Sequence, residues 1–265
     1  MLFALALTAV LGSTPQTDAH GVYAVVAIYD LRPDTNDLFE AALRETQADL
    51  GRDGSFLNER VLRNLDPLAA QYATYTKVRD SGAAGALFER RMQRLASYCR
   101  RAPEKHVLRL THAYHLNGAS SEPATGLEYG VGRVGQVAHL GLFVPYPKYR
   151  QQYDDTLHDV KQFIRDRTPA GYIGEDVLVE VAAPSPREQT PHSPDPREPS
   201  PMSVNYGEYD SLETAENAYT NRHNRPTDPK IVVMERLFFS ALQVPTRFYL
   251  FEVIGNVGSR RSAAR

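Results

Sequence analysis

The segment Phe56–Leu62, FLNERVL, decides the fold because the chain repeats its pattern at Tyr172–Leu178, YIGEDVL. Both copies read aromatic, aliphatic, any residue, Glu, any residue, Val and Leu. Each copy follows an amphipathic helical pattern and precedes another strand and a second helix. Because an internal repeat indicates a duplicated structural unit, we predict two copies of one supersecondary fold.

The first half of the chain predicts the order strand, helix, strand, strand, helix, strand. Its runs of β-branched and aromatic residues predict strands, and its apolar residues at helical spacing predict helices. This order is the ferredoxin-like arrangement. The predicted strands are 23–29, 56–62, 72–78 and 106–116. The first predicted helix starts near Thr35, and the second runs from Asp80–Ser81 to about Arg101.

The second half repeats this order. Its predicted strands are 137–144, 172–181, 202–209 and 246–254, and its predicted helices are 149–167 and a helix from Ser211. Two antiparallel sheets that each carry helices on one face leave two bare apolar faces, which one chain buries by packing them together. We therefore predict the α+β class, with two tandem ferredoxin-like β-α-β-β-α-β repeats packed sheet-to-sheet as an intrachain α+β barrel.

The segments outside the repeats differ in composition. Met1–Leu11 is apolar and uncharged and precedes the small residues Thr17–Ala19, which is typical of a secretory signal cleaved near Ala19. We therefore expect a periplasmic or secreted protein, or a cytoplasmic one if the N-terminus is misread. The predicted boundaries are a signal segment 1–19, repeats 20–117 and 137–256, a linker 118–136, a Pro-rich insertion 183–201, an apolar insertion 224–243 and a disordered tail 257–265.

Composition narrows the class of protein. The chain has 265 residues, 42% of them hydrophobic and 23% charged, with a formal net charge of -2. Such a balance suits a globular protein and gives no electrostatic reason to expect a nucleic-acid partner. The apolar run at the N-terminus is too short to cross a bilayer as a helix, so we expect no membrane span.

Five segments carry a resemblance to a known family: Tyr23–Tyr29, the helix from Leu38, Phe56–Leu62, Tyr75 leading into Asp80–Ser81, and Tyr209–Tyr219. On these segments the chain resembles the antibiotic biosynthesis monooxygenase-like branch of the dimeric α+β barrel superfamily, as two tandem copies. The resemblance implies pockets between the helices and the sheet. It also implies activities that include cofactor-independent oxygenation of polycyclic aromatics, haem degradation and chlorite dismutation.

The family resemblance also singles out two tyrosines. Members often have Trp at the end of the third strand and His within the second helix, whereas this chain contains no Trp. Tyr209 stands at the aromatic position of the second half, and Tyr219 stands at the His position. Together with Tyr75 and Tyr206 on the two third strands, they are the candidate substrate-binding residues, although tyrosines are also common in strand cores.

Histidines are the candidate catalytic residues. His106 and His112 are expected on one face of their strand and His115 on the other. His112, and His139 on the equivalent of the first strand, could act as a general base or ligate haem, or could be satisfied structural residues. Glu59 and Glu175 fall at equivalent points of the repeat, where salt bridges at the sheet end or exposed positions are expected.

Two functions follow from these patterns. The first is an exported monooxygenase-like barrel that acts on or binds a bulky aromatic or haem-like small molecule, without a required cofactor or with haem. The second is a non-catalytic barrel in which the second repeat replaces a dimer partner. The sequence predicts no metal site and leaves both a monomer and a dimer open.

Overall fold

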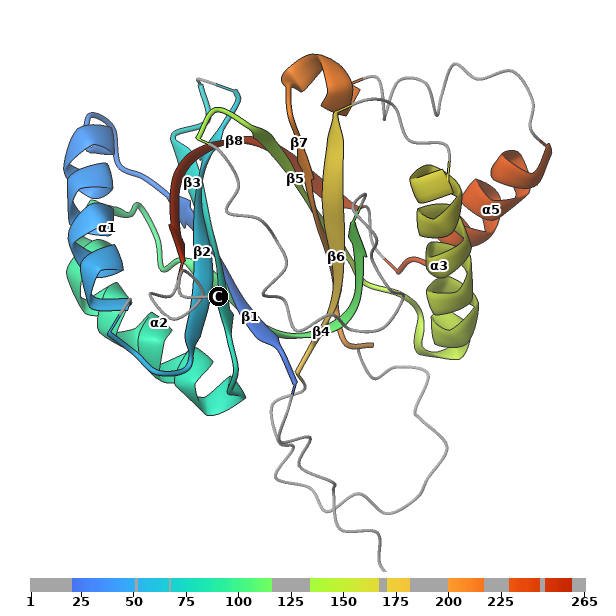
Figure 1. Ribbon diagram of the computed structural model, residues 1–265, viewed down its shortest axis with the longest axis horizontal. Coiled ribbons are helices and arrows are strands. Elements are labelled where there is room, and N and C mark those ends of the chain that lie inside the picture. The colour runs from blue at the N-terminus through green and yellow to red at the C-terminus, as the bar shows by residue number, and fades with distance from the viewer. Residues whose placement is uncertain are drawn as a thin grey trace, which may run out of the picture.

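Eight antiparallel strands form a closed barrel in the computed structural model, which describes residues 21–50, 52–66, 68–115, 134–166, 171–181, 200–216, 229–243 and 246–258. Figure 1 shows the barrel between two groups of helices, with α1 and α2 on one side and α3 and α5 on the other. The predicted α+β class and the barrel within one chain are therefore confirmed.

The first repeat contains six main elements. They are β1 (Tyr23–Asp30), α1 (Asn36–Leu50), β2 (Phe56–Asn64), β3 (Gln71–Val78), α2 (Ser81–Leu95) and β4 (Glu104–His115). The α2 helix begins where the sequence predicts it, because the Asp80 side chain accepts a hydrogen bond from the backbone N–H of Ala83. It ends at Leu95 rather than near Arg101, and a 3-10 turn, Ala96–Tyr98, follows it.

The second repeat follows the same order of strands. Its elements are β5 (Val137–Phe143), α3 (Arg150–Asp166), β6 (Tyr172–Glu180), β7 (Ser203–Tyr209), α5 (Pro229–Ser240) and β8 (Arg247–Gly258). The predicted apolar insertion contains α5, which lies beside α3 in Figure 1. The last strand continues to Gly258, beyond the predicted strand end at Ile254 and into the expected tail.

The strand order shows how the barrel closes. Around the barrel the order is β1-β3-β2-β8-β5-β7-β6-β4, so each repeat keeps the order of a ferredoxin-like sheet. The two sheets join where β2 pairs with β8 and where β4 pairs with β6, both antiparallel. Because both ends of each sheet are paired with the other repeat, neither presents an open edge.

The pairing of β2 with β3 and of β6 with β7 supports the duplication seen in the sequence. Phe56 lies opposite Val78, and Tyr172 lies opposite Tyr209. Each pair is followed by a register shift of the same kind, between Phe56 and Asn58 in one repeat and between Tyr172 and Gly174 in the other. The two sequence copies therefore adopt the same irregular backbone.

The apolar core has three main parts. The interior of the barrel holds one cluster, which includes Val26, Leu108, Leu140 and Phe251. A second cluster lies between the first sheet and α1 and α2, and a third lies between the second sheet and α3 and α5. Each sheet therefore separates the barrel interior from a helix-covered outer face, and both spaces are candidate sites for function.

Several predictions lie outside the described residues. These are the signal segment, Tyr219, and almost all of the linker and the Pro-rich insertion. Within the described ranges, no helix combines the length and apolar character that a transmembrane span requires.

Candidate functional site

Two of the predicted substrate-binding tyrosines meet inside the barrel. The rings of Tyr75 and Tyr206 stack with their centroids 4.1 Å apart, and both residues are buried. The Tyr75 hydroxyl donates to Asp176 at 2.5 Å, and the Tyr206 hydroxyl donates to Glu208 at 2.8 Å. Because both rings are packed and both hydroxyls are used, this position favours a structural role in the core.

The carboxylates that accept these bonds also pair with buried cations. Arg60 donates to Glu208 at 2.7 Å, and Lys77 lies 2.5 Å from Asp176. Burial, reinforced by the neighbouring carboxylates, raises the pKa of Tyr75 and that of Tyr206 well above their usual value. The tyrosines therefore stay protonated as donors, and these six side chains form a polar network inside the barrel.

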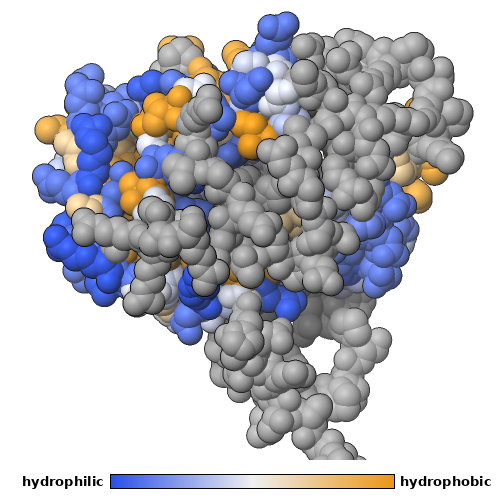
Figure 2. All heavy atoms as spheres, in the orientation of Figure 1, coloured by the Kyte–Doolittle hydropathy of each residue, from blue (hydrophilic) through white to orange (hydrophobic). Residues whose placement is uncertain are grey.

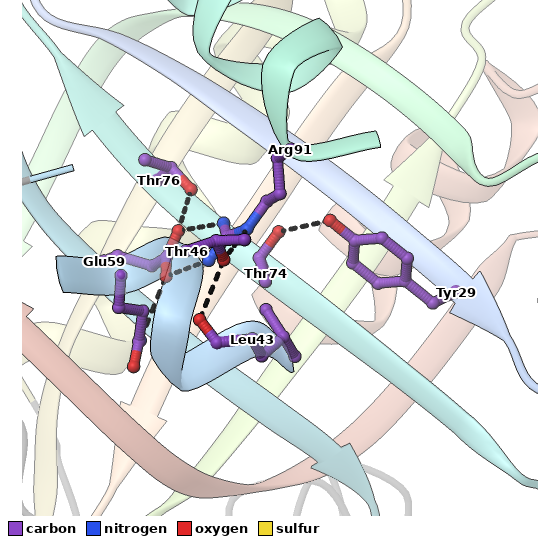
Figure 3. Close-up of polar contacts among 8 residues, drawn as sticks. Tyr29, Leu43, Thr46, Glu59, Thr74, Thr76 and Arg91 are labelled. Atoms are coloured by element: carbon purple, nitrogen blue, oxygen red, sulfur yellow. Dashed lines mark hydrogen bonds and ion pairs between the residues drawn. The ribbon is translucent and has the colours of Figure 1, made fainter. Parts of the chain in front are cut away.

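Glu59 and Arg91 form a buried ion pair between the outer face of the first sheet and α2 (Figure 3). Glu59 forms a salt bridge, as one of the two expectations had it, but the residue is fully buried in the middle of β2 rather than exposed or at the sheet end. Its carboxylate accepts hydrogen bonds from Gln47 at 3.0 Å, from Thr76 at 2.6 Å, and from both terminal nitrogens of Arg91. The charge is satisfied because α2 brings an arginine down onto the sheet.

Arg91 is a residue that the sequence prediction missed, although a signal was present. It falls between Leu87 and Leu95 at helical spacing, on the apolar face of α2. Burial alone would lower its pKa, but the Glu59 carboxylate raises the pKa above the ordinary value. The space left beside this pair, next to Tyr29 and Thr74, is only about 10 Å³. This particular space is too small for a substrate.

The second repeat replaces this arrangement with a histidine. Glu175 lies at the position equivalent to Glu59, and its carboxylate is 3.1 Å from Nε2 of His139. Both side chains are almost completely buried. The ring of His139 lies against Gly207, where a Cβ atom would overlap it, and stacks on Phe248 with centroids 5.4 Å apart. His139 is thus in hydrogen-bond contact with a buried carboxylate, and it does not line the cavities described below.

The predicted residue His112 does line a cavity. This cavity of about 120 Å³ lies between α3 and the outer face of β4 and β6. Tyr114 and His158 share it, with the Tyr114 hydroxyl 2.9 Å from Nδ1 of His158. The rings of His112 and His158 have centroids 5.7 Å apart. Sequence reasoning missed His158 although a signal was present, because it directly follows Leu157, which lies with Tyr153 on the apolar face of α3 that packs on the sheet.

A bulge in β4 corrects the predicted faces of its histidines. The pairing of β4 with β6 shifts register between Leu110 and His112. This shift moves the later residues to the opposite face. His106 therefore contacts Glu104 and Glu180, whereas His112 faces α3, and the prediction that these two histidines share a face is wrong.

The cavity gives His112 the properties of a proton acceptor. Burial and, secondly, the nearby His158 lower its pKa below the ordinary value of 6.5. Its imidazole is therefore mainly neutral at pH 7. Within the described part of the chain no residue hydrogen-bonds to this ring, so its nitrogens are open to a ligand. A neutral imidazole in a half-buried cavity suits general-base chemistry.

Tyr209, another predicted site residue, is buried on the same outer face. Its ring centroid lies 5.7 Å from that of Tyr172 and 5.7 Å from that of His139. It supports the His139 ring and does not line the cavity at His112. Tyr219, as noted, is outside the described residues.

The described residues do not fit a haem or a metal ion. The cavity at His112, at about 120 Å³, is somewhat smaller than a closed cavity of about 150 Å³ that holds benzene. A haem macrocycle is several times larger, and Nε2 of His139 is already engaged by Glu175. No group of three His, Cys, Asp or Glu in the described ranges is placed to hold a metal.

Comparisons with known proteins agree with this architecture. No family model and no curated protein matches the sequence. Among solved structures, an anthrone oxidase-like protein matches 92% of this chain and 95% of its own at 13% identity, with a TM-score of 0.61. A candidate monooxygenase from Fusobacterium nucleatum matches 90% of this chain and 95% of its own at 7% identity, with a TM-score of 0.60.

A candidate chlorite dismutase matches 89% of this chain and 96% of its own at 9% identity, with a TM-score of 0.56. Identities this low show a shared fold and not a shared reaction. The chain therefore has the fold of the dimeric α+β barrel proteins, which monooxygenase-like and chlorite dismutase-like structures share, with two ferredoxin-like repeats in one polypeptide.

Proposed function

We propose that the protein is a monooxygenase-like enzyme that binds an aromatic molecule in the cavity at His112. The observation that carries this proposal is a largely neutral imidazole that lines a cavity of about 120 Å³, a volume close to that of a cavity that holds benzene. The apolar side chains of Leu157, Val177 and Val179 line the same cavity. A larger aromatic molecule would place one edge in the cavity beside His112 and keep its remaining rings outside the cavity.

The proposed role of His112 is that of a general base. It would accept a proton from an acidic C–H or O–H group of the aromatic molecule and leave an electron-rich anion. For a ring system such as anthrone, dioxygen would then replace the two hydrogens of a CH₂ group, so that the products are a carbonyl and water. His158 and Tyr114 are 2.9 Å apart at the same cavity and would orient the substrate by hydrogen bonds.

Oxygen consumption with anthrone tests this function. We expect the protein to accelerate oxygen uptake above the rate in buffer, with anthraquinone as product. His112→Gln should reduce the rate by about 10²-fold or more, as for loss of a general base. His106→Gln is the matched control, because His106 lies on the same strand but outside the cavity, and it should keep the rate. No acceleration by the wild-type protein would contradict the proposal.

The alternative is a non-catalytic barrel in which the second repeat serves as a built-in partner for the first. The ion pairs Arg60–Glu208 and Lys77–Asp176 favour it, because both join one repeat to the other. This function predicts no oxygen uptake, no change in the melting temperature with anthrone, and no change in the absorbance spectrum of added haemin. A ligand that binds the folded state should raise the melting temperature.

We also propose export, from the sequence of Met1–Ala19 alone. Mass spectrometry of the mature protein provides the test. Export predicts a chain that lacks the first 19 residues or so, and an intact N-terminus on protein retained in the cytoplasm would contradict it.

A further inference from the structure

A second cavity, of about 480 Å³, lies between the C-terminal end of α1 with the loop that follows it and the second half of α2. This volume falls in the range of small-molecule sites. We propose that it binds a small amphipathic oxyanion, meaning a phosphate or carboxylate group attached to an apolar body. The proposal is independent of the function proposed above, because the cavity belongs to the first repeat and does not include His112.

Cationic side chains outnumber carboxylates in this cavity. Its lining contains four guanidinium groups and two carboxylates, which belong to Arg52, Arg90, Arg91 and Arg94 and to Asp49 and Asp53. Arg91 is already neutralised from below by Glu59. Three guanidinium groups therefore face two carboxylates at the mouth, and this excess of positive charge favours an anionic ligand.

The existing ion pairs leave donors for such a ligand. Asp49 is shared, since it accepts from Arg52 at 3.2 Å and from Arg94 at 3.0 Å. Arg90 makes a single contact with Asp53, at 3.2 Å. Within the described ranges each of these three arginines donates one side-chain hydrogen bond, although a guanidinium group has five N–H donors. Arginine suits a phosphate or carboxylate because it can bind two oxygens at once.

The floor of the cavity explains why the ligand should also have an apolar part. Leu50 and Leu87 line the cavity beside the charged groups. Arg91 is held in place by Glu59 and by a 3.0 Å hydrogen bond from its Nε to Thr46, as Figure 3 shows. Because Arg91 is already held in one position, it loses little conformational entropy when a ligand binds, whereas the exposed arginines at the mouth can adjust to the ligand. Figure 2 shows a mostly hydrophilic surface on the side of the molecule where α1 and α2 lie.

Calorimetric titration of the full-length protein with phenyl phosphate and with inorganic phosphate tests this site. Phenyl phosphate should bind more tightly than inorganic phosphate, because only phenyl phosphate can use the leucines. The double variant Arg90→Gln and Arg94→Gln should weaken phenyl phosphate binding by about tenfold or more, since each lost charged hydrogen bond is worth about that much. Both arginines are largely exposed, so the variant should fold.

The matched control is Arg44→Gln, an exposed arginine of α1 that pairs with Glu40 and does not line the cavity. It should bind phenyl phosphate as the wild type does. Absence of binding, or equal weakening by Arg44→Gln and the double variant, would overturn the site. Equal affinity for the two phosphates would overturn the apolar part of the proposal.

Discussion

Arg60 and Asp176 occupy the same position in the two repeats and carry opposite charges. Arg60 binds Glu208 of the second repeat, and Asp176 binds Lys77 of the first. Lys77 and Glu208 are themselves equivalent, each one residue before the end of its third strand. The first repeat therefore supplies both cations and the second both anions. Two first repeats would bring Arg60 against Lys77, so this pattern favours pairing of unlike repeats.

Removal of one partner from a buried ion pair should destabilise the fold strongly. Lys77→Met leaves the buried Asp176 carboxylate without its cation, which should lower the free energy of unfolding by about 3–5 kcal/mol. The double variant Lys77→Met and Asp176→Asn removes both charges and should recover a large part of this loss. Urea denaturation of the wild type, of Lys77→Met and of the double variant measures these differences in the free energy of unfolding. A double variant less stable than Lys77→Met would contradict the interpretation.

Gly207 should be intolerant of alanine because of the ring that lies against it. A Cβ at this position would overlap the imidazole of His139 and displace it from Glu175. Overpacking of this kind costs about 1–3 kcal/mol. Gly85 is the control, since a Cβ there meets nothing within 4 Å and the residue lies in α2. Gly85→Ala should stabilise the protein by up to about 1 kcal/mol.

Thermal denaturation of the two glycine variants distinguishes these effects. The melting temperature should fall for Gly207→Ala and rise for Gly85→Ala. Equal shifts in the two variants would show that the close contact at His139 has no energetic consequence.

His106 should make stability depend on pH. Burial alone would lower its pKa, but hydrogen bonds to Glu180 and Glu104 raise the pKa above 6.5. Protonated His106 therefore stabilises the folded state, and this contribution is complete below pH 6.5 and is lost as pH rises through the pKa of His106 in the folded protein. The pKa of Glu104 is lowered chiefly by Arg247 and that of Glu180 chiefly by His106. Their contribution is complete above pH 4.5 and is lost as pH falls further.

The combined effect of these groups is greatest between pH 4.5 and 6.5. In His106→Gln the decline in unfolding free energy above pH 6.5 should be reduced, because the titrating group is gone. Urea denaturation at several pH values measures the slope. The same slope in wild type and variant would place the pH dependence elsewhere.

The architecture could be predicted well from the sequence, because strands, helices and caps are marked by local residue patterns. The repeated pattern at Phe56–Leu62 and Tyr172–Leu178 predicted equivalent strands, and Asp80 marked the start of α2, as the structure confirms. The ion pairs could not be predicted, since Arg60 and Glu208 are far apart in sequence and meet only when the barrel closes.

The candidate site was predicted less well for a similar reason. His112 was identified, but a single bulge in β4 decides which way it faces. No periodicity reveals such a register shift. His158 reaches the cavity only through the packing of α3 on the sheet, which depends on contacts between distant segments.

Closure of the barrel within one chain is tested most directly by a disulfide between β2 and β8. Arg63 and Glu252 lie directly opposite each other on these strands, and both are partly exposed. Opposite residues of an antiparallel pair approach closely enough for a disulfide. The native Cys99 is buried, and burial raises the pKa of its thiol to about 11, so it should not interfere.

The measurement is the migration of the oxidised double variant Arg63→Cys and Glu252→Cys on a non-reducing denaturing gel. Closure within one chain predicts a monomer that migrates faster than its reduced form. A disulfide-linked dimer, or no disulfide at all, would contradict the account.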